Sequence, residues 1–419
     1  MAFNDRSSVG NILNSHDYKL KYLLTFLAIG QCGIGFLGSK EVYIFALVIL
    51  VGVMLTSRRS LRAINVLPWA SANLLIYVLQ SISFDAFDVS IVQLLYFYIR
   101  LIVPALYLAV IGVEFHKYYI KIIYYYAVIS LFFWGIELLI PPLGQLLRGW
   151  AIRFSQATGS FVVDYKNISL FLLYTFTTMS KFHTMPRNSG PFWEPGAFAV
   201  YLAVALVFLY LHTKTVRNKH VAILTVAMIT TQSTAGYVSL FLFWSWVILD
   251  SNSRYKLFIF VLLALGSYFF FESAPFMNQK ITEMYETQSE QDLSGFTSGR
   301  FYSARKSINA IWQHPFIGRG ISRRTAYDEY SEFYGAYGII NVPSRFGLIM
   351  GSVYFILLFA SLKRYSSLRS SRNLGVLATS SFIILLPVYF SQGVYLSVVN
   401  LMILQSVLVF DKFTNNQNI

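Results

Sequence analysis

The sequence is poor in charged residues and has almost no cysteine. Of its 419 residues, 12% are Asp, Glu, Lys or Arg and 56% are hydrophobic, whereas soluble domains carry about 25% charged residues. A soluble protein of this length would need a charged surface to cover its core. The single cysteine, Cys32, excludes an intramolecular disulfide and any cysteine-cluster metal site. The composition therefore indicates a membrane protein.

Several catalytic motifs are also missing from the sequence. It contains no Walker phosphate-binding loop, no HExxH zinc motif and no GxSxG nucleophile elbow. An ATPase or a zinc protease is therefore not expected. Because no basic run sits on a soluble domain, nucleic acid is not expected as a partner either.

Long apolar runs are what the sequence does contain. Each has about 17–23 residues, the length of helix that spans a hydrocarbon core of about 30 Å. Only helices satisfy their own backbone in lipid over such segments. The predicted fold class is thus an all-α polytopic membrane protein with about 12 transmembrane helices. They start near Lys21, Val42, Ala63, Ser90, Tyr118, Gly196, Val221, Tyr237, Leu257, Arg345, Leu374 and Leu396.

The connections between these runs alternate in charge. One set of short connections, together with both termini, holds 18 of the 33 Lys and Arg. Because cytoplasmic loops carry an excess of these residues, the pattern predicts that this set and both termini are cytoplasmic. An even number of spans agrees with termini on the same side. The N-terminus shows no cleavable signal pattern, so we expect the first run to remain as an anchor.

The other side is predicted to hold two large loops. The predicted order is spans 1–5 in residues 1–140, the first loop in 141–195, spans 6–9 in 196–271, the second loop in 272–344, and spans 10–12 with the C-terminus in 345–419. With Arg345 at the edge of the second, the large loops hold 13 further Lys and Arg. Ordinary solvated cations or a surface for an anion such as a phosphate would both explain this charge.

Arg100 is a cation in the middle of a predicted span, within "YFYIRLIVPALYL". A cation at this depth costs about 2.5–3.5 kcal/mol on insertion scales. Two interpretations fit it: a structural ion pair or snorkelling to the membrane surface, and a cavity that receives an anionic head group.

The first large loop ends in "PRNSGPFWEPGAFA", where a new span begins. Pro195 suits the first turn of a helix, and Glu194 lies where the helix dipole favours a carboxylate. Glu194 could therefore cap the helix, or it could accept a proton from a hydroxyl nucleophile. Arg187, seven residues upstream, brings the opposite charge to the same edge of the membrane.

The second large loop contains "TSGRFYSARKSINAIWQHPFIGRGISRR". Residues 303–312 predict a short amphipathic helix, and Gly318 and Gly320 a tight turn. Arginine suits bidentate contacts with phosphate, and the loop offers Arg300, Arg305, Arg319, Arg323 and Arg324. Acidic residues in the same loop provide alternative partners for some of them. Between the loops, "QSTAGY" carries small residues that favour close helix packing.

The ordered motifs resemble those of bacterial O-antigen polymerases of the Wzy type. "RNSGPFWEPGAFA" is similar to the pattern R-x-x-G-x-F-x-E-P-x-x-x-A, and "QSTAGY", "SGRFYSARKSINAIWQHPFIGRG" and "SRFGLIMG" follow it. Together they cover roughly residues 187–350. These enzymes belong to the O-antigen ligase and polymerase superfamily. The resemblance implies a GT-C-like glycosyltransferase of the bacterial inner membrane, with two large periplasmic loops and a periplasmic active site.

The resemblance also implies a reaction and a set of site residues. Such polymerases transfer a glycan linked to undecaprenyl diphosphate onto the non-reducing end of another lipid-linked repeat unit, without metal or nucleotide sugar. A separate chain-length regulator is an expected partner. Carried onto this sequence, Glu194 would activate the acceptor hydroxyl, and the loop arginines would bind the diphosphate. The loop cations are Arg187 and Arg300, then Arg305, with Arg323 and the intramembrane Arg100 as further candidates.

One departure from the family pattern bears on the reaction. Relatives, ligases above all, often carry a His-Asn pair before the span that follows the second loop. Here the stretch reads "GIINVPSRFG", with Asn341 and no histidine, which favours a polymerase. The alternatives are a ligase that transfers the glycan to lipid A-core and, from a different class, a polysaccharide-lipid flippase.

Overall fold

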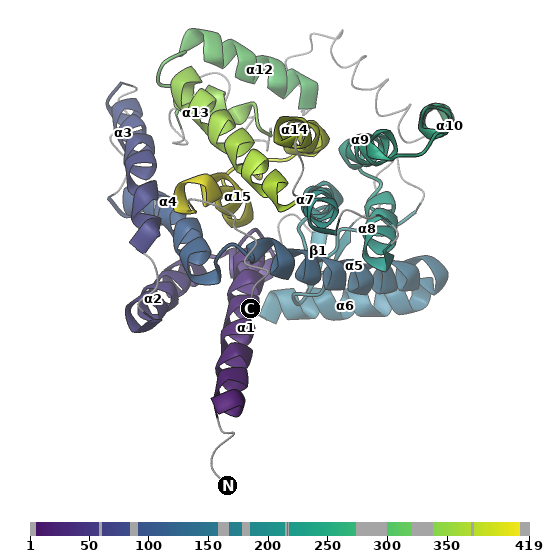
Figure 1. Ribbon diagram of the computed structural model, residues 1–419, viewed down its shortest axis with the longest axis horizontal. Helices are drawn as coiled ribbons and strands as arrows, with labels where there is room; N and C mark the ends of the chain where they lie inside the picture. The colour runs from purple at the N-terminus through teal and green to yellow at the C-terminus, as the bar shows by residue number, and fades with distance from the viewer. Residues whose placement is uncertain are drawn as a thin grey trace.

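The computed structural model describes residues 6–57, 61–83, 91–157, 167–177, 185–213, 216, 218–273, 300–320, 338–369 and 373–410. Figure 1 shows this part of the chain as a bundle of helices with one small hairpin. The N-terminal part contributes α1 (Arg6–Gly30), α2 (Lys40–Ser57), α3 (Leu67–Ser83), α4 (Ile91–Ile111) and α5 (Phe115–Leu139). The central and C-terminal parts add α7 (Pro195–Thr213), α8 (Lys219–Thr230), α9 (Thr234–Asp250), α10 (Lys256–Ser273), α13 (Asn341–Ser366), α14 (Leu374–Ser391) and α15 (Val398–Val409).

All twelve predicted apolar runs are helical, which confirms an all-α polytopic membrane protein. Among the described residues, six helices are long and apolar enough to cross a membrane: Arg62–Ser83, Ile91–Ile111, Phe115–Leu139, Pro195–Thr213, Asn341–Ser366 and Leu374–Ser391. Four more apolar helices, in α8, α9, α10 and α15, are shorter. That all twelve apolar helices cross the membrane stays a prediction.

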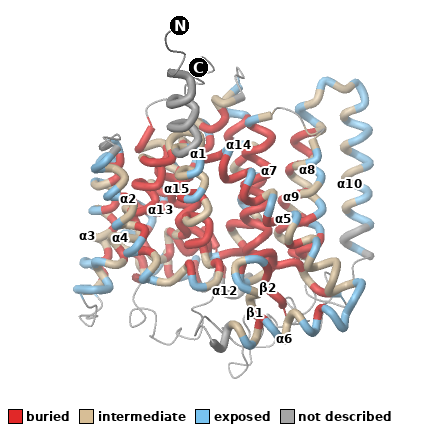
Figure 2. Tube along the Cα trace, turned by 90° about the horizontal axis from the view of Figure 1, so that it is seen from below, coloured by how far each residue is buried: buried red, intermediate tan, exposed pale blue. Residues whose placement is uncertain are grey.

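Helix α7 lies at the centre of the bundle. Its sequence is apolar on every side, a pattern typical of a helix without a solvent face. Along its most apolar stretch, 89% of the residues are buried. They pack against the neighbouring helices α5, α8, α9 and α14. Figure 2 shows α7 as an almost uninterrupted buried segment. The packing of α7 in the core therefore fixes the position of its first residues.

The first predicted loop contains regular structure. Helix α6 (Pro141–Ala157) follows α5 directly, and strands β1 (Asn167–Leu170) and β2 (Tyr174–Thr177) form an antiparallel hairpin with Asn167 opposite Thr177. Ala151 of α6 packs with Ile168, Tyr174 and Phe176 in a small second core. The predicted helix of the second loop is confirmed as α12 (Arg300–Gln313). Figure 2 shows α6, the hairpin and α12 at one end of the bundle.

The helices alternate in direction, which separates two ends of the bundle. At one end, the ring of His116 lies 5.2 Å from that of His212 and 6.2 Å from that of Tyr365, so the start of α5 meets the ends of α7 and α13. The basic connections around Lys117, Lys219 and Lys256 lie at this end, which we call the basic end. The opposite end, which we call the motif end, holds residues 185–194, the α8–α9 turn and residues 314–320 (Figure 2).

Candidate functional site

The segment 185–194, just before α7, is fastened to the turn between α8 and α9. Asn188 is fully buried, and its backbone N–H donates to the carbonyl of Thr230 at 3.0 Å. Its side-chain Nδ2 donates to Thr230 Oγ1 at 2.9 Å and to Ser130 Oγ of α5 at 3.1 Å, and its Oδ1 accepts from the N–H of Gly190 at 3.0 Å. One amide thus joins α5, α8 and the segment that contains Arg187.

Arg187 is half-buried beside the same turn. Its Nε donates to the carbonyl of Thr231 at 3.3 Å, and its Nη2 donates to the carbonyl of Gln232 at 3.2 Å. Gln232 Nε2 in turn donates to the carbonyl of Pro186 at 3.2 Å. Carbonyl oxygens fix the direction of a guanidinium without cancelling its charge, because they carry only partial charge. The turn therefore presents Arg187 in a defined orientation at the motif end.

This contact gives the "QSTAGY" stretch a role that the sequence did not reveal. Close packing was predicted for it and is confirmed: a Cβ on Gly236 would lie 3.1 Å from Ala199 Cβ of α7. In addition, Ser233 Oγ accepts from the N–H of Gly236 at 3.3 Å and caps α9. The orientation of Arg187 depends on main-chain carbonyls, and the sequence pattern does not predict which carbonyls these are.

The segment next turns sharply onto α7. Gly190 adopts φ +53°, a left-handed conformation that favours glycine, and the Phe198 ring lies 2.8 Å from where its Cβ would be. The Phe192 ring then stacks on Tyr201 of α7, with centroids 4.1 Å apart and an interplanar angle of 8°. This aromatic anchor sets the position of Glu194 two residues later.

Glu194 lies at the start of α7, as predicted. Its main-chain carbonyl accepts from the N–H groups of Ala197 at 3.1 Å and Phe198 at 3.2 Å. Within the described part of the chain, its half-buried carboxylate makes no hydrogen bond or ion pair. The backbone of Glu194 thus begins the helix, while its carboxylate stays available for another partner.

Gln392 adjoins the start of α7 and was not among the predicted site residues. A Cβ on Gly196 would collide with its side-chain amide. Gln392 is 1% exposed, and neither Nε2 nor Oε1 has a hydrogen-bond partner among the described residues. On the α13 side of the same α14–α15 connection, Arg345 lies over the Tyr395 ring at 5.9 Å. The connection therefore contacts both the start of α7 and the start of α13.

The second loop docks onto a break at the start of α13. Gly347 adopts φ +81° there and leaves helical geometry. Residues 314–320 fill the gap: the N–H of Leu348 donates to the carbonyl of Pro315 at 2.7 Å, and the N–H of Arg319 donates to the carbonyl of Ser344 at 2.9 Å. The motif "HPFIGRG" and the stretch "SRFG" thus form one structural unit.

Asn341 is buried within this unit. Its Oδ1 accepts from Arg319 Nη2 at 3.3 Å and lies 3.4 Å from Ser307 Oγ of α12. Arg319 was predicted as one of five loop cations, and here it is oriented by a neutral side chain. The position where ligases often carry a His-Asn pair therefore holds α12 and the loop together in this protein.

The remaining predicted cations fall in different places. Arg300 and Arg305 lie on α12, but their side chains are outside the described residues, as is Arg323 altogether. Arg100 of α4 lies close to Tyr43 of α2 and to Tyr96, and its buried Nε has no hydrogen-bond partner among the described residues. Figure 1 places α2 and α4 on the opposite side of the bundle from α8 and α9. The structure therefore does not bring Arg100 to Arg187.

The hairpin of the first loop is bonded to α5 through a half-buried acid. Tyr174 Oη of β2 donates to Glu137 Oε2 of α5 at 2.6 Å. Burial, and then the negative charge of Glu137, raise the pKa of Tyr174 well above its usual value, so the phenol stays a hydrogen-bond donor. Thr177 at the end of β2 donates through Oγ1 to the carbonyl of Arg187 at 3.3 Å. The hairpin thus braces the Arg187 segment.

The comparisons with known proteins match only one part of the candidate site, which leaves out Arg187 and Glu194. Residues 219–344 match the family model described as O-antigen ligase. The matched range includes the α8–α9 turn, α12 and Asn341. Neither a curated protein nor a solved structure gives a significant match to the chain. Over this range, which is less than a third of its length, the chain is thus similar to the O-antigen ligase family, whose members are glycosyltransferase-like membrane enzymes.

Proposed function

We propose that the chain is an O-antigen polymerase that transfers a glycan from undecaprenyl diphosphate onto a second lipid-linked repeat unit. The observation that carries this proposal is the pairing of two motifs at one end of the bundle. Arg187 is oriented by the carbonyls of Thr231 and Gln232, and Glu194 opens α7 seven residues later. A fixed cation and an available carboxylate at one membrane edge are the groups that this transfer needs.

In the proposed reaction, the acceptor hydroxyl oxygen forms a bond to the anomeric carbon of the donor glycan. The bond between that carbon and the diphosphate oxygen breaks, and the diphosphate leaves with the electron pair. Arg187 stabilises the charge that develops on the diphosphate, because a preorganised cation costs no reorganisation at that moment. Glu194 accepts the proton of the attacking hydroxyl. Arg300, Arg305 and Arg323 of the second loop are proposed as further contacts to the diphosphate.

The polymerase is preferred over a ligase because of Asn341. Its side chain is engaged with Arg319 and Ser307, and the stretch around it contains no histidine. The proposed orientation places the motif end in the periplasm and the basic end, with Lys117 and Lys219, in the cytoplasm. A flippase is not favoured, because the matched family contains glycosyltransferase-like enzymes.

The test is a lipopolysaccharide gel from a deletion strain that carries the wild type, Arg187→Ala or Arg300→Ala. We expect the wild type to restore a ladder of chain lengths and each variant to give a single-repeat band. Asn218→Ala, which removes the cap of α8 at the basic end, is the control and should restore the ladder. Immunoblots of membranes establish that all forms are present.

Other outcomes of the gel distinguish the alternatives. Lipopolysaccharide without any O-antigen in the deletion strain would indicate a ligase. A normal ladder in the deletion strain would contradict the polymerase. A ladder restored equally by the wild type and both arginine variants would leave the reaction in place and reject the proposed diphosphate site.

A further inference from the structure

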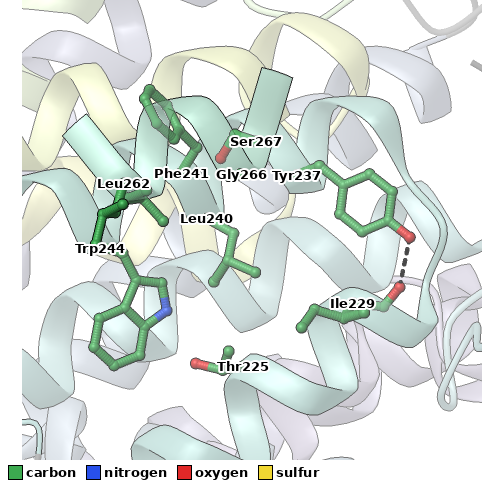
Figure 3. A pocket seen from close by; sticks show the side chains of 10 residues that line it. Thr225, Ile229, Tyr237, Leu240, Phe241, Trp244, Leu262, Gly266 and Ser267 are labelled. Carbon is green, nitrogen blue, oxygen red and sulfur yellow. Dashed lines mark hydrogen bonds between the residues drawn. The ribbon is translucent and has the colours of Figure 1, made fainter. Parts of the chain in front are cut away.

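A groove on the side of the bundle lies between α8, α9 and α10. Its volume is about 410 Å³, within the range of about 300–1,000 Å³ that is usual for small-molecule sites. Figure 3 shows that Leu240, Phe241 and Trp244 of α9 line it together with Leu262 and Gly266 of α10. Because these are apolar helices of a membrane protein, the groove is accessible to lipids.

Helix α10 leaves this groove open because it is attached mainly to α9. Figure 1 shows α10 at the edge of the bundle, outside the central packing. Its side chains Leu257, Val261, Leu265 and Phe269 are exposed. A Cβ added at Gly266 would meet nothing within 4 Å. The groove is therefore a space between helices that the protein's own side chains leave unfilled at this position.

The groove runs into the membrane from the motif end. Tyr237, near the start of α9, lines the part of the groove next to the motif end. Trp244 lies seven residues further along the helix. Seven residues correspond to about 10 Å at a helical rise of 1.5 Å per residue. The Tyr237 hydroxyl donates to the carbonyl of Ile229 at 2.9 Å, as the dashed line in Figure 3 marks. The groove is thus oriented along the helices, as a lipid chain would be.

Tyr237 also connects the groove with the candidate site. Arg187 bonds to the carbonyls of Thr231 and Gln232, and Tyr237 follows Gln232 by five residues, in the first turn of α9. A molecule with an anionic head beside Arg187 would therefore have its tail at the entrance of the groove. The head would lie at Arg187 beside the Thr231 and Gln232 carbonyls, and the tail along α9, which follows these residues.

We propose that the α8–α9–α10 groove binds the isoprenoid chain of a single-chain polyprenyl diphosphate, with the diphosphate at Arg187. The proposal rests on the proposed function, which supplies an anionic head carried by one chain. A groove bordered by three helices fits one chain, whereas a glycerophospholipid has two. Because lipid tails are as apolar as the groove, transfer from the bilayer gains packing rather than hydrophobic energy. The groove therefore selects and orients the chain more than it strengthens binding.

The experiment uses the full chain in nanodiscs and a polyprenyl diphosphate with a photoreactive diazirine in its tail. Peptide mapping after illumination should locate labels on α8, α9 and α10. Undecaprenyl diphosphate should compete with the probe, and phosphatidylglycerol at the same concentration should not. Gly266→Leu fills the open space in the groove and should lower labelling by about fivefold, or roughly 1 kcal/mol.

Gly52→Leu is the matched control, because Gly52 of α2 also has nothing within 4 Å of an added Cβ and lies on another apolar helix. It should leave labelling unchanged. Equal labelling of wild type and Gly266→Leu, labels on other helices, or equal competition by phosphatidylglycerol would each overturn the proposal. Labelling requires no turnover. A protein that is labelled as expected but forms no polymer would therefore refute the proposed function and leave the groove assignment standing.

Discussion

Asn188 and Thr230 are joined by two hydrogen bonds, one from backbone N–H to carbonyl at 3.0 Å and one from side-chain Nδ2 to Oγ1 at 2.9 Å. The two residues are 42 positions apart, one in the segment before α7 and the other at the end of α8. Since Arg187 directly precedes Asn188, this double contact fixes the main chain from which the Arg187 side chain extends. Asn188 is therefore a positioning residue for the candidate diphosphate site.

Asn188→Ala should lower both stability and turnover. It leaves the buried hydroxyls of Thr230 and Ser130 without this donor, which costs about 1–3 kcal/mol. A displacement of about 1 Å at a reacting group costs up to about 10²-fold in rate, so we expect a fall in kcat together with a rise in KM. Glycan transfer by purified protein and thermal unfolding in detergent measure the two effects.

Asn218→Ala is the matched control for this prediction. Asn218 Oδ1 accepts from the N–H of His220 at 3.0 Å at the basic end of α8, and loss of such a cap costs about 1 kcal/mol. It should reduce stability while leaving kcat and KM unchanged. If both variants lose activity in proportion to stability, Asn188 has only a structural role.

Glu194→Gln should lower kcat and leave KM nearly unchanged. The amide keeps the shape of the side chain but cannot accept the proton of the acceptor hydroxyl, and loss of a general base lowers rates by about 10²–10⁴-fold. Glu194→Asp should recover part of the rate. Glu41→Gln, which changes an exposed carboxylate at the start of α2, should behave like wild type. Normal kcat in Glu194→Gln would remove Glu194 from the mechanism.

Gly190→Ala should destabilise the protein by about 2 kcal/mol, from a left-handed backbone and crowding against a packed ring. Its φ is +53°, and the added Cβ would lie 2.8 Å from the Phe198 ring. Thermal unfolding measures the change. Gly135→Ala in α5 has nothing within 4 Å of its Cβ and should be neutral or slightly stabilising. Equal unfolding temperatures for both variants would contradict the strained turn.

Tyr174→Phe should change how stability depends on alkaline pH. Because the folded pKa of Tyr174 is raised by burial and by Glu137, the unfolded chain loses this proton first, near pH 10. The wild type should therefore lose stability as the pH rises through about 10, and Tyr174→Phe should show less of this loss. Below that pH, the variant should be less stable by about 1 kcal/mol, because the half-buried carboxylate of Glu137 loses its donor.

Unfolding in detergent between pH 7 and 11 measures the Tyr174 effect. Tyr255→Phe changes an exposed tyrosine near the basic end and serves as control. A wild type and a Tyr174→Phe variant with parallel pH profiles would show that Tyr174 does not contribute to the alkaline loss.

The sequence predicted the helices well because lipid imposes one strong requirement on long apolar segments. Each predicted run became a helix, and the amphipathic spacing of residues 303–312 predicted α12. The β hairpin escaped prediction because its strands are only four residues each, too short for a clear alternation of apolar and polar side chains. Two of the predicted runs form helices shorter than a span, since α8 and α15 have only 12 residues each.

The site was predictable in its residue types and not in its partners. Glu194 and Arg187 stood out as charges at a membrane edge, and both lie at the motif end. The carbonyls that orient Arg187 depend on where α8 stops, which is a property of tertiary packing. Gln392 gave no sequence signal, because a glutamine in a short connection is ordinary. Arg100 stood out because a cation in the middle of a span is costly to bury in the membrane. Its neighbours are tyrosines of α2 and α4 rather than Arg187.

The docking of residues 314–320 onto the break in α13 has a consequence for how this part of the chain folds. Gly320 N–H donates to the carbonyl of Arg345 at 3.3 Å, and Ile339 N–H donates to the carbonyl of Tyr389 at 2.8 Å. The residues around the start of α13 are thus bonded both to residues 314–320 and to α14. Because buried backbone groups need these partners, the start of α13 becomes ordered together with α14 and the end of the second-loop motif, as one cooperative unit.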